Sequence, residues 1–113
     1  MAEFFPDLDL IIYEINPKYN VKSIIINKLS SEKYPNKTIL CLSKHQEKVI
    51  ISARRQDYKI PINDLLSDAI EDLPGSTAGG HIPAAGASVR KKDLKRFKDK
   101  IKELLRTKYK ITN

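Results

Sequence analysis

The residues with the clearest chemical potential lie in one short stretch of small residues around a histidine. The stretch reads Gly79-Gly80-His81-Ile82-Pro83-Ala84-Ala85-Gly86. Glycine and alanine leave backbone N–H groups open to close approach by a phosphate or a sugar. A histidine beside them can donate a charge-assisted hydrogen bond to a phosphate oxygen. Spacing alone allows a second interpretation, a tight turn in which the glycines serve only backbone geometry.

A strongly basic segment follows this stretch. Residues 90–110 hold eleven Lys and Arg against three Asp and Glu, whereas the other 92 residues hold ten basic and eleven acidic side chains. The net charge of +7 therefore comes from one segment. Its apolar residues recur at helical spacing and predict a long amphipathic helix: Leu94, Phe97, Ile101, Leu104 and Leu105. Asp93 is expected to cap this helix or to act as an acid of its first turn.

Beside the apolar stripe of this helix lies a basic ridge: Lys91, Lys95, Lys98, Lys102 and Arg106. At about 100° per residue these side chains are neighbours on the helix surface. The basic ridge is a candidate for non-specific contact with the phosphates of a single-stranded nucleic acid. A solvated, lysine-rich helix face is the alternative.

The elements that must position these residues follow from the pattern of the rest of the chain. Runs rich in β-branched residues predict strands at 8–15, 38–42 and 49–53, with a further short strand at 86–89. Helical spacing predicts helices at 21–34, with Ser23 as its N-cap, and at 62–73, with Asn63 as its cap. The order favours an α/β or α+β fold, a small mixed β-sheet covered by helices.

Length and composition restrict the class of protein. At 113 residues, 41% hydrophobic and 31% charged, the chain fits one globular domain over residues 1–113. No apolar run reaches the roughly 18 residues of a membrane span, and the N-terminus lacks the pattern of a secretory signal, so we expect a cytoplasmic protein with no membrane partner. Cys41 is expected to be a buried, inert thiol, and two histidines provide no zinc-site spacing.

Gly-Gly-His-Ile-Pro-Ala-Ala-Gly closely resembles the Gly-Gly-Gly-His-x-x-Ala-Ala-Gly motif of the DHH-associated substrate-binding domain. That domain is the C-terminal part of DHH-type phosphoesterases, which include RecJ-like exonucleases and nanoRNases. Ser52-Ala53-Arg54 resembles the Ser-x-Arg strand motif of the same family, and it precedes the glycine stretch in the family's order. Among these proteins the chain is most similar to archaeal RecJ-like proteins, a group that includes partners of the replicative GINS complex.

The resemblance implies a set of substrate phosphate-binding residues: Arg54, Gly79, Gly80, His81 and Ser52. The planar fork of arginine suits bidentate contact with phosphate. The chain departs from the motif at Ala78, where the family has a further glycine, so Ala78 is not carried over as a contact. Arg55 is expected to be an exposed strand-end arginine. Tyr13, Tyr34 and Tyr58 could stack on bases, but core or rim positions are favoured.

The catalytic metal ligands of DHH phosphoesterases belong to a separate domain with an Asp-His-His motif, which is absent from this sequence. Hydrolysis by two metal ions needs several converging carboxylate and imidazole ligands. The resemblance therefore implies a substrate-binding module of a metal-dependent phosphodiesterase or exonuclease, with Mn or Mg in the catalytic domain and no catalytic residue, metal or cofactor here. The implied partners are a single-stranded nucleic acid or short oligonucleotide, a DHH catalytic domain and replication proteins.

Two other functions stay open at this stage. One is a non-catalytic protein-interaction module of a replication or repair assembly, in which the basic helix meets an acidic partner surface. The other is a tRNA-binding appendage, because alanyl-tRNA synthetases carry a related C-terminal domain. The histidine-containing glycine stretch favours the phosphoesterase branch.

Overall fold

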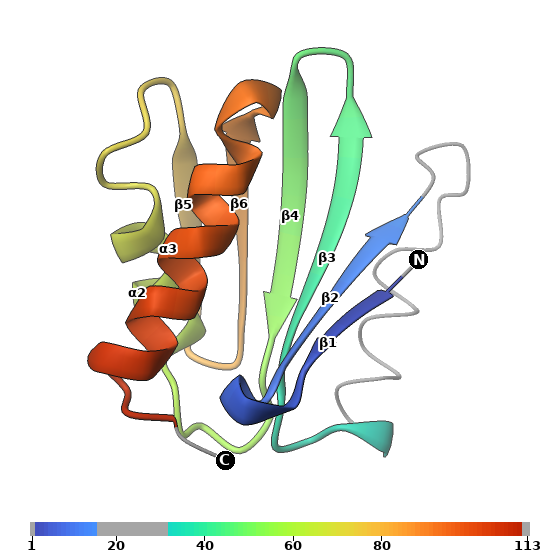
Figure 1. Ribbon diagram of the computed structural model, residues 1–113, viewed down its shortest axis with the longest axis vertical. Helices are drawn as coiled ribbons and strands as arrows, with labels where there is room; N and C mark the ends of the chain where they lie inside the picture. The colour runs from blue at the N-terminus through green and yellow to red at the C-terminus, as the bar shows by residue number, and fades with distance from the viewer. Residues whose placement is uncertain (1, 16–31, 112–113) are drawn as a thin grey trace.

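A six-stranded mixed β-sheet organises the part of the chain that the structure describes, residues 2–15 and 32–111 of a computed structural model (Figure 1). Its strands are β1 (Ala2–Phe5), β2 (Leu10–Ile15), β3 (Thr38–His45), β4 (Lys48–Arg54), β5 (Thr77–Gly80) and β6 (Ala84–Arg90). Their order in the sheet is β1-β2-β3-β4-β6-β5. β2 and β3 are parallel, and the other neighbours are antiparallel. The prediction of a small mixed sheet with helices is confirmed.

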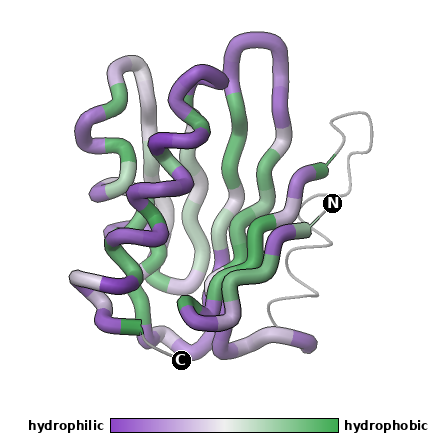
Figure 2. Tube along the Cα trace, viewed as in Figure 1, coloured by the Kyte–Doolittle hydropathy of each residue, from purple (hydrophilic) through white to green (hydrophobic). Residues whose placement is uncertain are grey.

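The helices α2 (Ile62–Ala69) and α3 (Leu94–Thr107) contribute to one hydrophobic core with the sheet. Two short 3-10 helices occur in the connections: η1 (Pro6–Leu8) lies between β1 and β2, and η3 (Lys91–Asp93) lies between β6 and α3. Figure 2 shows how hydropathy is distributed along the chain. Apolar residues follow the central strands, and hydrophilic residues lie on the outer turns of α3 and on the β3–β4 turn. Within the described ranges, no helix combines the length and apolar character that a membrane crossing requires.

The two faces of β4 have different surroundings because side chains alternate along a strand. Val49, Ile51 and Ala53 are at most 1% exposed and belong to the core beneath the helices. The alternate residues of β4 point away from that core, and they include the partly exposed Ser52 and Arg54. The same strand thus supplies core residues on one side and candidate site residues on the other.

The β2–β3 half of this second face is closed by a small apolar cluster. Ile39 and Cys41 are fully buried there, and Tyr13, Ile15 and Tyr34 pack against them. The predicted burial of Cys41 is confirmed, as are core or rim positions for Tyr13 and Tyr34. The β4–β6–β5 half of the face contains the smaller residues discussed below.

The predicted helix at 62–73 is shorter in the structure, because α2 ends at Ala69. Leu73 is still buried in the core, so its apolar character reflected packing and not helical structure. Asn63 is not the cap: the N-cap position is Pro61, with no side-chain cap hydrogen bond, and Asn63 Oδ1 is buried without a hydrogen-bond partner in the described structure.

The C-terminal helix agrees with its prediction. Phe97, Ile101 and Leu105 of α3 are fully buried. Asp93 precedes α3, but its carboxylate makes no cap hydrogen bond. It is 4% exposed and accepts a hydrogen bond of 2.7 Å from Arg90 Nε instead.

The prediction for Arg55 is wrong, because this side chain is 1% exposed. Its guanidinium donates to both carboxylate oxygens of Asp57, at 2.9 and 3.1 Å, and to Thr38 Oγ1 at 3.1 Å. Burial of a charge is tolerated when the charge is paired and its donors are hydrogen-bonded. Through its hydrogen bond to Thr38, Arg55 therefore links the end of β4 to the start of β3.

The glycine stretch, where the sequence predicted a strand only from Gly86, is largely a β-hairpin. β5 ends at Gly80, β6 begins at Ala84, and His81 and Ala84 exchange backbone hydrogen bonds of 2.8 and 3.2 Å. Gly80 has a φ of +143°, and a Cβ there would lie 2.5 Å from Ala85 Cα. Gly79 has open space where its Cβ would be.

Other differences concern the N-terminal third. The sequence did not predict β1, and the strand expected at 8–15 begins only at Leu10, after η1. The helix predicted at 21–34, including its Ser23 cap, lies outside the described residues except for its last three positions.

Replacement of Asp57 by Asn is expected to lower the free energy of unfolding by about 1–3 kcal/mol at neutral pH, because buried donors of Arg55 lose an ionised acceptor. Burial raises the pKa of Asp57, but hydrogen bonds from Arg55 and from the Lys59 N–H, with the positive charge of Arg55, outweigh it and leave the pKa lowered. The contribution is therefore present above the usual carboxyl range and lost as pH falls through the folded-state pKa. Urea unfolding at neutral and strongly acidic pH measures it.

The control is Glu71→Gln, which neutralises an exposed carboxylate on the surface. It should change stability by less than about 0.5 kcal/mol at either pH. An equal loss for Asp57→Asn at both pH values would contradict the ionic role of this carboxylate.

The hairpin glycines provide a matched pair of substitutions. Gly80→Ala should destabilise the fold by about 2 kcal/mol or more, since the added methyl group meets backbone and φ is unfavourable. Gly79→Ala should stay within about 0.5 kcal/mol. Denaturant midpoints of the two variants test this, and similar midpoints would show that the hairpin does not have the described geometry.

Candidate phosphate-binding site

The β5–β6 hairpin is held against the segment that follows β4. The Arg55 N–H donates to the Pro83 carbonyl at 3.0 Å, and the Ile62 N–H donates to the Ile82 carbonyl at 2.9 Å. These two bonds bracket the linker between β4 and α2. The hairpin tip is therefore fixed at the carboxyl end of β4, beside Arg54.

Strand register brings the two sequence motifs together. Arg54 is opposite Ala84 and Ser52 is opposite Gly86 across β4 and β6, while Gly79 is opposite Gly86 across β6 and β5. The Ser-x-Arg strand and the glycine stretch thus lie on three adjacent strands. Sheet pairing and the two hydrogen bonds from the linker together bring the two motifs side by side.

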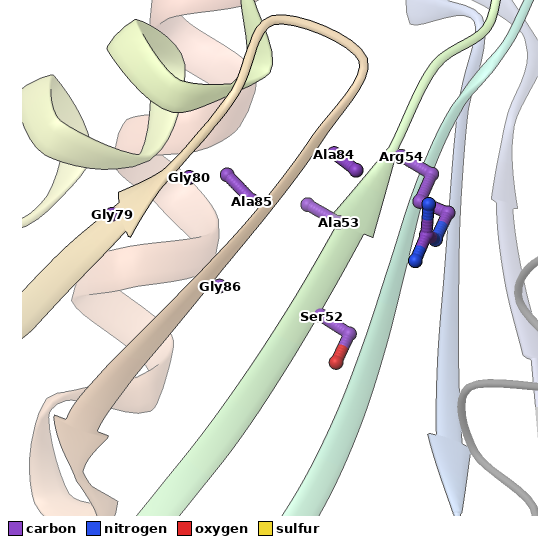
Figure 3. Close-up of a pocket in the computed structure, with 8 residues that line it drawn as sticks. All are labelled: Ser52, Ala53, Arg54, Gly79, Gly80, Ala84, Ala85 and Gly86. Carbon is purple, nitrogen blue, oxygen red and sulfur yellow. The ribbon is translucent and has the colours of Figure 1, made fainter.

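A hollow of about 320 Å³ lies at this junction (Figure 3). It is lined by Ser52, Ala53, Arg54, Gly79, Gly80, Ala84, Ala85 and Gly86. In Figure 3 the side chains of Ser52 and Arg54 extend on the same side of β4. The lining combines a guanidinium, a hydroxyl and small residues, which is the chemistry expected for a bound phosphate or sugar.

Arg54 is available for a ligand in this arrangement. Its side chain is partly exposed, and no acidic side chain of the described residues forms an ion pair with it. Arg55, the next residue, has the opposite environment, with its charge paired inside the protein. One arginine therefore holds the strand end, and its neighbour faces the hollow.

The predicted site residues are partly brought together. Arg54, Ser52, Gly79 and Gly80 line one hollow. His81 directly follows Gly80 and is exposed at the hairpin tip, but it is not among the residues that line the hollow.

Ala53 of the Ser-x-Arg motif lines the hollow without having been predicted as a contact, and so do three residues of the glycine stretch, Ala84, Ala85 and Gly86. The role of these three residues in the hollow comes from strand pairing with β4 and β5. Ala84 to Ala87 are all small residues that run directly into the strand predicted at 86–89, and this continuity was the signal that the strand begins at Ala84.

The predicted basic ridge lies away from the hollow. α3 packs on the Val49, Ile51 and Ala53 face of the sheet, whereas Ser52 and Arg54 are on the other face. Ion pairs within the described residues also offset much of its charge: Lys95 and Lys102 with Asp99, and Lys98 with Glu3. The hydrogen bond between Lys95 and Asp99 raises the pKa of the lysine and lowers that of the aspartate.

Other candidate groups do not join the site by any described contact. Tyr58, expected in the core or rim, is 61% exposed in the linker after β4, so that prediction is wrong. Among the described residues, no cluster of three or more His, Cys, Asp or Glu side chains is arranged to hold a metal ion. The basic ridge and Tyr58 are thus separate surface features.

Comparison with solved structures places this fold among known domains. The C-Ala domain of alanyl-tRNA synthetase from Aquifex aeolicus superposes with a TM-score of 0.60 at 13% identity, covering 93% of this chain and 95% of that one. RecJ from Thermus thermophilus in complex with Mn²⁺ gives a TM-score of 0.62 at 18% identity, covering 88% of this chain. A pGpG-specific phosphodiesterase, PggH from Vibrio cholerae, gives 0.59 at 10% identity, covering 92% of this chain.

The chain spans only 14% of the RecJ chain and 34% of the PggH chain, so it corresponds to one part of those proteins. No curated protein sequence matches it significantly. Residues 9–107 match the DHHA1 domain, a range that includes both motifs and every residue lining the hollow. The chain therefore belongs to the DHHA1 domain family, the DHH-associated domain of DHH phosphoesterases.

Proposed function

We propose that this chain binds the phosphates of a single-stranded nucleic acid or short oligonucleotide through the hollow at Arg54 and presents the substrate to a DHH catalytic domain. The observation that carries the proposal is that Arg54, which forms no ion pair with a described acidic side chain, lines one hollow with the glycines of β5 and β6. Arginine donors and open backbone N–H groups are the usual partners of phosphate. His81, at the adjacent hairpin tip, supplies a further donor.

In this proposal the phosphodiester chemistry belongs to the catalytic domain. The similar RecJ structures were determined with Mn²⁺ or Mg²⁺, which supports a divalent metal in such a domain. The contribution of the present chain is to hold and orient phosphate oxygens. A RecJ-like exonuclease is the parent enzyme we favour, and replication proteins are its expected partners.

A tRNA-binding appendage is the second candidate, because the chain covers 95% of the C-Ala domain of alanyl-tRNA synthetase. The two functions differ in what the hollow must recognise. A single phosphate group at Arg54 suits a short oligonucleotide, whereas a folded RNA would need a broader surface.

Arg54→Ala is expected to weaken binding of a dye-labelled dinucleotide with a 5′-phosphate, pTpT, by about tenfold to a hundredfold, the value of one or two charged hydrogen bonds. His81→Ala should weaken it less, since His81 lies at the rim. Fluorescence anisotropy at low salt measures both affinities. Arg106→Ala, an exposed arginine at the end of α3, is the matched control and should leave the affinity unchanged.

Gly79→Ala adds an independent test, because it places a methyl group in the hollow without a clash in the fold. It should weaken pTpT binding while the unfolding midpoint stays the same. If neither Arg54→Ala nor Gly79→Ala changes the affinity, the hollow is not the phosphate site. Tight binding of a folded tRNA that is insensitive to Arg54→Ala would favour the appendage instead.

A further inference from the structure

A second group of cations lies at the opposite end of β4, on the same face of the sheet as Arg54. Lys48 and Arg90 are register partners across β4 and β6. By strand alternation Lys48 shares its face with Ser52 and Arg54, and Arg90 shares its face with Gly86. In Figure 1 the β3–β4 turn and the β5–β6 turn lie at opposite ends of the sheet. The two cationic ends therefore belong to one surface.

The charge of this second group is only partly offset. Arg90 donates to Asp93 at 2.7 Å, yet its side chain stays 35% exposed. Lys48, Lys91 and Lys92 are exposed, and none of them forms an ion pair with a described acid. Glu47 at the adjacent turn is the acid beside them, and its carbonyl accepts from the Lys91 N–H at 2.7 Å. The group remains net positive.

The surface between the two cationic ends holds small and polar residues of β4, β5 and β6 around one large apolar side chain, Ile50. Ile50 and Ser88 are opposite each other, Thr77 is opposite Ser88, and Ser52 is opposite Gly86. No Asp or Glu occurs in β4, β5 or β6, so nothing on these strands repels a phosphate. Hydroxyl groups and glycine backbone favour a sugar–phosphate chain over an apolar partner.

We propose that a single-stranded oligonucleotide longer than a dinucleotide follows this face from Arg54 along β4 and β6 to Lys48 and Arg90. The proposal rests on the proposed function, because its first anchor is the hollow at Arg54. It adds to the proposed function a second phosphate contact, at Lys48 and Arg90, and the direction in which the oligonucleotide runs across the sheet. The four ridge residues that belong to α3 itself are excluded from this path, since α3 lies on the other face: Lys95, Lys98, Lys102 and Arg106.

The length of β4 sets the size of the ligand. Six residue steps separate Lys48 from Arg54, which is about 20 Å at the usual rise of a strand. At the 3.4 Å spacing of a stacked strand, this distance corresponds to about six nucleotides, and to fewer in an extended strand. A dinucleotide at Arg54 cannot reach Lys48, but a ligand of about eight nucleotides can.

The test compares Lys48→Gln with Arg106→Gln, two neutralisations of exposed cations on opposite faces of the sheet. Anisotropy is measured for dye-labelled pTpT and for an oligothymidylate of about eight nucleotides, over a range of salt concentrations. Lys48→Gln should weaken the longer ligand by about threefold to tenfold, reduce its salt slope by about 0.7 and leave pTpT unchanged. Arg106→Gln should change neither ligand.

Loss of the longer ligand in Arg106→Gln equal to that in Lys48→Gln would overturn the path, as would an equal effect of Lys48→Gln on both ligands. Arg54→Ala separates the two proposals. If Arg54→Ala weakens pTpT but Lys48→Gln leaves the longer ligand unchanged, the phosphate site holds and the path is wrong. If Arg54→Ala has no effect on pTpT, or neither ligand binds the chain, the proposed function fails and the path fails with it.

Discussion

Strand alternation in β4 is the constraint on which the rest of the structure depends. This strand pairs with both β3 and β6, so its register fixes two neighbours at once. Val49, Ile51 and Ala53 must face the helices to complete the core. Ser52 and Arg54 then have to face the other side, where the glycines of β5 and β6 lie. A shift of one residue would bury the arginine and expose the core.

Two neighbouring arginines show how the protein separates stability from recognition. Arg55 turns inward to Asp57 and Thr38, and Arg54 turns outward to the hollow. A buried guanidinium has little freedom, because its donors are already committed to fixed acceptors. The strand end is thus rigid at the position from which Arg54 extends, and such rigidity lowers the cost of ordering a ligand contact.

The sequence predicted the fold class, α3 and the two motifs, because apolar periodicity and small-residue stretches are local signals. It could not predict the environment of Arg55, since burial of that side chain depends on Thr38, seventeen positions away. It predicted no strand around Gly80, because glycine indicates a turn as readily as a strand that pairs closely with its neighbour. Most importantly, the basic helix is adjacent to the glycine stretch in sequence, but the chain crosses to the other face of the sheet between them.

The buried cysteine has a consequence of its own. Cys41 is opposite Ser52 across β3 and β4, so the only thiol of the chain lies one strand away from the hollow, beneath Tyr13 and Tyr34. A buried thiol reacts only when its surroundings open. The rate at which a thiol reagent modifies Cys41 in the native protein therefore reports how often this half of the sheet opens. No introduced label is needed for that measurement.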